Sequence, residues 1–130
     1  MRAGLATLAR MDRDVKALAA LLAVAGVAHF VRPAPFESIV PRALPRKREL
    51  VHASGVAEVA CAAMILHPRT RRAGGLAAAG LLVSVFPANV QMSVTALRSE
   101  RASTGYKVGT LARLPLQVPL VRTALKAARS

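Results

Sequence analysis

Aromatic side chains are scarce in this sequence: Phe, Trp and Tyr make up 3% of the 130 residues, and Trp is absent. Proteins that hold single-stranded nucleic acids stack the bases on aromatic side chains. No helical stretch of this chain sets a basic face against apolar residues at helical spacing. Although 19 Lys and Arg against 6 Asp and Glu give a net charge of +13, we therefore expect no nucleic-acid partner.

Cysteine is nearly absent as well. The single residue, Cys61, excludes an internal disulfide and a metal site made only of cysteines. His52 and His67 lie at opposite ends of one expected helix, about 22 Å apart by helical rise, so they cannot share a metal. The sequence contains no CxxC, no phosphate-binding loop and no Ser/His/Asp order. We therefore predict no metal site and name no catalytic residue.

Long apolar runs, in contrast, fill most of the chain. It is 54% hydrophobic, and its Lys and Arg fall mainly between or beside uncharged runs, as they do in loops that flank membrane spans. We predict one all-α membrane domain over residues 1–130, an antiparallel four-helix bundle with spans at about 15–31, 50–67, 73–92 and 106–125. Residues 32–49 contain four prolines, which exclude a continuous helix. This segment is predicted to be an interfacial loop between the first two spans.

Two of these spans have alternatives. The first could be read as a signal peptide, with 23–25 (AVA) as its cleavage site, but acidic residues precede it and further spans follow. The fourth contains Arg113 and two prolines, so an amphipathic segment on the membrane surface is its alternative. The side of the bundle that holds both termini collects more Lys and Arg than the other side. This bias favours a multi-pass protein of the plasma membrane with cytoplasmic termini.

Glu58 is the acidic residue that lies in the middle of an apolar span. A carboxylate at that depth costs about 2.5–3.5 kcal/mol on insertion scales. Ser54 and Gly55 share its helical face and form a stripe of small and polar groups, which should face the bundle interior. Arg113 is the expected counter-ion of Glu58. The pair is either a structural contact or part of a protonatable, ligand-binding site, and the alternative is a neutral Glu58 without a dedicated partner.

Other polar and small residues interrupt the apolar runs. His29 is either an interfacial residue or a proton-transfer group. Asn89 follows Pro87 and is either a helix-end hydrogen-bonder or a ligand. Gly80 and Ser84 lie four residues apart and should let another helix approach closely.

Four short motifs occur in the order of the four spans: residues 26–30 (GVAHF), 54–58 (SGVAE), 86–89 (FPAN) and 113–117 (RLPLQ). With the proline-rich segment 35–45, they resemble the DoxX-like family of small membrane proteins. The resemblance implies a four-helix membrane bundle. It also implies that the family's recurrent polar positions are His29, Glu58, Asn89, Arg113 and Gln117.

The family takes its name from a subunit of a thiosulfate–quinone oxidoreductase, and most members have no established reaction. The resemblance therefore implies a non-catalytic membrane subunit of a redox enzyme, with a quinone as the cofactor it could meet and no other cofactor evident. A small proton-coupled transporter that uses Glu58 is the alternative. Expected partners are the lipid bilayer, a soluble or membrane redox enzyme, and a second copy of the chain.

Overall fold

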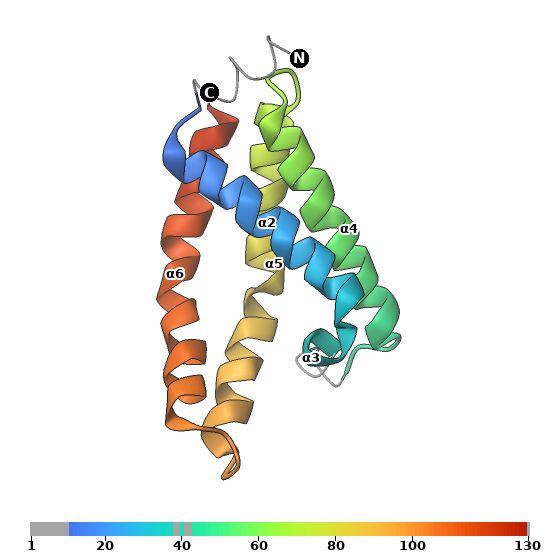
Figure 1. The fold of residues 1–130 in the computed structure, drawn as a ribbon, viewed down its shortest axis with the longest axis vertical. Coiled ribbons are helices and arrows are strands. Elements are labelled where there is room, and N and C mark those ends of the chain that lie inside the picture. The colour runs from blue at the N-terminus through green and yellow to red at the C-terminus, as the bar shows by residue number, and fades with distance from the viewer. Residues whose placement is uncertain (1–10, 38–39, 41–42, 130) are drawn as a thin grey trace.

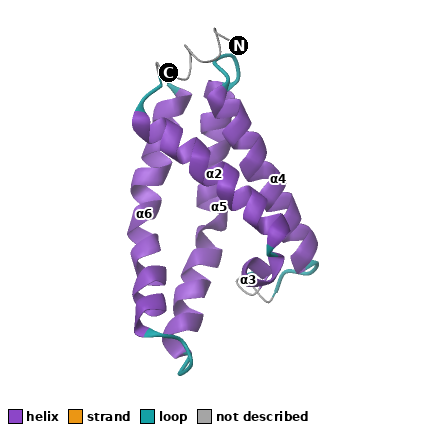
Figure 2. Ribbon diagram, in the orientation of Figure 1, coloured by secondary structure: helices purple, strands orange, loops and turns teal. Residues whose placement is uncertain are grey.

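The computed structural model describes residues 11–37, 40 and 43–129. Its helices are α2 (Arg13–Val31), α3 (Pro33–Glu37), α4 (Lys47–Leu66), α5 (Arg71–Arg98) and α6 (Thr104–Ala128). The described residues form helices and loops without any strand (Figure 2). The predicted all-α class is confirmed.

The four long helices alternate in direction (Figure 1). α2 runs towards α3, α4 runs back beside α2, α5 runs in the opposite direction to α4, and α6 runs back beside α5, so that α2 begins and α6 ends at the same end of the bundle. The most extensive contacts join α5 to α6 and α2 to α4, and α4 packs on α5. The antiparallel four-helix bundle expected from the sequence is therefore present, arranged as two helix pairs.

Three of the helices, α2, α4 and α5, are long and apolar enough to cross a membrane. Many of their large apolar side chains face outward, including Val24 and Val31, which are 69% and 70% exposed. Outward-facing apolar side chains suit a hydrocarbon environment. The chain is an α-helical membrane protein. That α6 also crosses the membrane stays a prediction.

Prolines do not end the helices in which they lie. α5 continues through Pro87 to Arg98, so it is longer than the predicted span 73–92. α6 continues through Pro115 and Pro119 after Ser103 caps it by accepting a hydrogen bond from the Tyr106 amide at 3.1 Å. Between α2 and α4, α3 forms little more than one turn of the proline-rich segment, and residues 38–39 and 41–42 lie outside the described residues.

Glycines let the helices approach one another closely. A Cβ on Gly55 would lie 2.9 Å from the Gly26 carbonyl oxygen, and one on Gly26 would lie 2.8 Å from the Gly55 carbonyl oxygen. A Cβ on Gly75 would similarly lie 2.5 Å from the carbonyl oxygen of Ala124 in α6. These backbone contacts leave no room for a side chain, so glycine determines the spacing of both helix pairs.

Side-chain contacts join the helices at the end of the bundle where α2 begins and α6 ends. Lys126 Nζ lies 2.9 Å from Asp12 Oδ2 and 3.1 Å from Asp14 Oδ2, which joins α6 to the start of α2. In the α4–α5 turn, Arg71 Nε donates to the Ile65 carbonyl at 2.8 Å, and the Thr70 hydroxyl donates to the Met64 carbonyl at 2.8 Å. The buried core, centred on side chains such as Leu18, Ile65 and Ala78, fills the same end.

Gly80 and Ser84 do not pack against another helix as the sequence led us to expect. A Cβ on Gly80 would have no neighbour within 4 Å among the described atoms. Ser84 donates its hydroxyl to the Gly80 carbonyl at 2.7 Å and is exposed. The close approach to α6 uses Gly75 instead, because Gly75 and Ala79 lie on the buried face of α5.

A test of this packing compares two glycine-to-alanine variants. Gly55→Ala inserts a methyl group into a backbone contact and should lower the free energy of unfolding by about 1–3 kcal/mol. Gly80→Ala places the same methyl group in open space, so stability should stay unchanged or rise slightly, since Ala favours helices over Gly. Denaturant unfolding in detergent micelles, followed by circular dichroism, measures both. Equal effects would contradict the packing described here.

Candidate functional site

The buried face of α4 positions Glu58. The buried residues of this helix recur at three- and four-residue spacing: Val51, Gly55, Glu58, Cys61, Ala62 and Ile65. Glu58 is only 9% exposed. Its burial follows from the helical period, since it lies one turn beyond the glycine that touches α2.

His29 faces Glu58 from α2. The imidazole Nδ1 lies 3.5 Å from Glu58 Oε2, and the residue is 7% exposed. Side chains on a helix lean towards its N-terminus, and α2 and α4 run in opposite directions. The two side chains therefore lean towards each other across the glycine contact.

Two further contacts fix the His29 ring. Its Nδ1 is within hydrogen-bond distance of the Ala25 carbonyl. Because a carbonyl can only accept, Nδ1 must carry the hydrogen, and in a neutral ring Nε2 is then the acceptor. The ring also stacks on Phe36 of α3, with centroids 3.9 Å apart and planes inclined by 19°. The aromatic ring of Phe36, which we did not predict as a site residue, thus orients the histidine.

The Glu58 carboxylate is only partly satisfied. Its Oε2 atom is buried and has no hydrogen-bond partner among the described residues. A buried polar atom without a partner is unfavourable, so this oxygen is suited to accept a hydrogen bond from a ligand.

These residues border a cavity of about 290 Å³ between the two helix pairs. Its polar lining consists of His29, Ser54, Glu58, Ser84, Asn89 and Arg113. Its apolar lining consists of Ala25, Phe36, Val40, Leu44, Leu50, Val51, Val85 and Ala88. Glu58 lies about 16 Å from the start of α4 by helical rise, so the cavity reaches the middle of the bundle. Four of the five polar positions predicted from sequence meet here.

Arg113 is not the direct partner of Glu58. Among the described residues, the basic side chain within 4 Å of the carboxylate is His29, 3.5 Å from Oε2, which forms an ion pair with it only when protonated. Arg113 lies further away and attracts the carboxylate electrostatically. Arg113 is exposed, at the edge of the cavity. The reason is the packing of α6, which contacts α5 along its length but makes few contacts with α2. The predicted Glu58–Arg113 contact is therefore replaced by a Glu58–His29 contact.

Gln117 lies elsewhere. It borders a separate groove between α5 and α6 together with Val83, Phe86 and Arg122. Of the predicted packing residues, Gly55 makes the close helix contact, and Ser54 and Ser84 line the cavity instead. Val40 and Leu44 form part of the apolar wall of the cavity. They belong to the segment 32–49, for which the sequence predicts an interfacial loop and no part of the site.

The donor set of the cavity suits an organic ligand. It offers a guanidinium, a side-chain amide, two hydroxyls and a carboxylate next to an imidazole. Within the described part of the chain, no group of three or more His, Cys, Asp or Glu side chains could hold a metal ion.

The fold and the cavity define a helical membrane protein with a polar site inside its bundle. The chain belongs to the family described as Domain of unknown function (DUF8561), whose model matches residues 18–128. Comparisons with curated proteins and with solved structures gave no match. The family match covers α4, α5, α6 and most of α2, so the cavity lies within the shared domain.

A double-mutant cycle tests the pairing at this site. Residues in contact show coupling energies of about 0.5–3 kcal/mol. We expect a coupling in that range between Glu58→Gln and His29→Gln, and a smaller one between Glu58→Gln and Arg113→Gln. Unfolding free energies of the single and double variants in micelles give both values. A larger coupling to Arg113 would show that the guanidinium, not the imidazole, pairs with Glu58.

Proposed function

We propose that this chain is a non-catalytic membrane subunit whose cavity receives the head group of a quinone and presents it to a redox enzyme in the plasma membrane. The observation that carries the proposal is the buried Glu58 Oε2 atom, which has no hydrogen-bond partner among the described residues and lies beside the His29–Phe36 stack in the lining of a cavity of about 290 Å³. The termini are cytoplasmic in this proposal.

The lining suits an amphiphile with a flat ring. A quinone has a planar head group with two carbonyl oxygens and a long apolar tail. Arg113 and Asn89 offer donors to carbonyl oxygens. Leu44, Leu50 and Val85 supply an apolar wall. Small-molecule sites generally combine such a wall with a few placed polar groups.

In this proposal His29 accepts and releases protons at the site, and Glu58 stabilises its protonated form. A bound quinone supplies the chemistry of carrying electrons and protons between membrane enzymes. His29 can accept a proton at Nε2 while Nδ1 remains bound to the Ala25 carbonyl. A protonated imidazole would then be stabilised by the Glu58 carboxylate 3.5 Å away. Glu58 Oε2 would accept a hydrogen bond from a hydroxyl of the reduced ring.

The redox partner in this proposal rests on the resemblance to DoxX-like proteins. In this proposal the chain accompanies an oxidoreductase and is not one itself. The same buried carboxylate next to a titratable histidine also favours a second candidate, a small proton-coupled transporter. Such a transporter would show proton-dependent efflux, and this efflux would be lost in Glu58→Gln.

Quinone binding tests the first half of the proposal. Isothermal titration calorimetry under anaerobic conditions, with a short-chain ubiquinol (the reduced form, whose hydroxyls can donate to Glu58) and the purified chain in detergent, should detect binding to the wild type. Glu58→Gln should weaken it roughly tenfold, which corresponds to about 1.4 kcal/mol, because the amide changes the group that accepts the hydrogen bond. Glu100→Gln makes the same chemical change on an exposed loop and should bind like the wild type. Absence of binding to the wild type would exclude a quinone site.

Co-purification tests the second half. The tagged chain is purified in mild detergent from its native membrane, as wild type and as Glu58→Gln. A stoichiometric oxidoreductase should accompany the wild type. Purification of the chain only with copies of itself would exclude the subunit role and direct the work to transport assays.

A further inference from the structure

A second hollow lies on the outside of the bundle, between α5 and α6. This groove has a volume of about 380 Å³ and is lined by Val83, Phe86, Gln117, Val118, Val121 and Arg122. Four of the six residues are apolar, and Val83 and Val118 are 58% and 55% exposed.

The groove is distinct from the cavity of the proposed quinone site. With 3.6 residues per turn, Val83 and Phe86 face one side of α5. The α5 residues that line the cavity, Ser84, Val85, Ala88 and Asn89, face the opposite side. A ligand in the groove would therefore meet the surrounding membrane rather than the His29–Glu58 pair.

Polarity in the groove changes with depth. Arg122 lies about 9 Å from the last residue of α6 by helical rise, at the end of the bundle where α2 begins and α6 ends. Phe86 lies about 22 Å from the first residue of α5, which starts at the same end. The cationic group is thus the residue nearest the membrane surface, and the aromatic ring is the deepest. This order matches a lipid with its head group at the surface and its acyl chain inside the bilayer.

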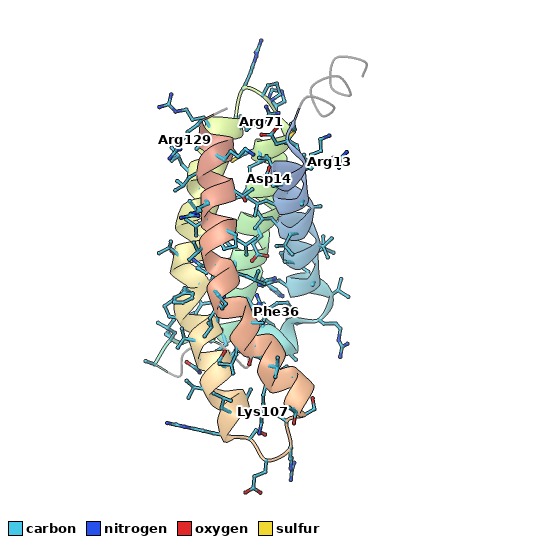
Figure 3. All side chains as sticks on the ribbon, turned by 90° about the vertical axis from the view of Figure 1, so that its left-hand side faces the viewer. Arg13, Asp14, Phe36, Arg71, Lys107 and Arg129 are labelled. Carbon is cyan, nitrogen blue, oxygen red and sulfur yellow. The ribbon has the colours of Figure 1, made fainter. Side chains whose placement is uncertain are left out.

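The same end of the bundle carries unneutralised positive charge. Figure 3 shows Arg13, Arg71 and Arg129 at this end, together with Asp14. Asp12 and Asp14 both pair with Lys126. No ion pair to a carboxylate involves Arg122 in the described residues. A negatively charged head group would therefore find in Arg122 an exposed guanidinium that no described carboxylate pairs with, and further cations near it.

We propose that the α5–α6 groove binds an anionic phospholipid. One acyl chain lies along Val118, Val121, Val83 and Phe86, and the phosphate contacts Arg122. A guanidinium can bind a phosphate through two parallel hydrogen bonds. The overall negative charge of the lipid sets the preference, because a zwitterionic head group brings a cation to the same basic surface.

The test uses native mass spectrometry of the detergent-purified chain with dioleoyl-phosphatidylglycerol or dioleoyl-phosphatidylcholine. The wild type should retain the anionic lipid preferentially. Arg122→Gln should reduce this preference about fivefold, the factor expected for one basic residue at an anionic surface. Val118→Trp should fill the groove and reduce retention of the anionic lipid, and circular dichroism checks that each variant keeps its helices.

Matched controls separate the groove from general charge. Arg98→Gln removes an exposed arginine at the other end of α5 and should keep the wild-type preference, as should Glu58→Gln in the cavity. An equal loss in Arg98→Gln and Arg122→Gln would assign the binding to diffuse charge and overturn the proposal. So would unchanged retention in Val118→Trp, or equal retention of both lipids by the wild type.

Discussion

The contact between Gly26 and Gly55 determines where the polar groups of the cavity lie. With no side chain between the two backbones, α2 and α4 approach closely enough for His29 to reach Glu58. The carboxylate is tolerated inside the bundle because this approach supplies a titratable partner and removes lipid from around it. A wider spacing of the two helices would leave a buried charge without a neighbour.

The sequence was sufficient to predict the helical class and the burial of Glu58. Long uncharged runs define helices in a membrane, and a carboxylate at that depth must face other helices rather than lipid. The helical period then assigns Gly55 to the same face as Glu58. Each of these inferences depends on neighbours within one helix, which is why each can be read from the sequence.

Contacts between helices were harder to predict. Opposite charge made Arg113 the natural partner of Glu58, but charge carries no information on distance, and α6 packs on α5 rather than on α4. Gln117, one turn beyond Arg113, borders the groove between α5 and α6 for the same reason. The contact of Phe36 with His29 could not be predicted from the sequence, because an aromatic residue in a proline-rich segment can lie against several surfaces. These positions depend on helix rotation and packing, which a single sequence does not encode in its period.

The ties at one end of the bundle have a mechanical consequence. Lys126, the α4–α5 turn and the apolar core all join the two helix pairs at the end where α2 begins and α6 ends. The cavity lies further along, where the pairs diverge (Figure 1). The two helix pairs are thus joined at one end and separate towards the other. A small change in the angle between the pairs would move the core residues little. The helix segments further from the joined end would move more, and those beyond the cavity would move most.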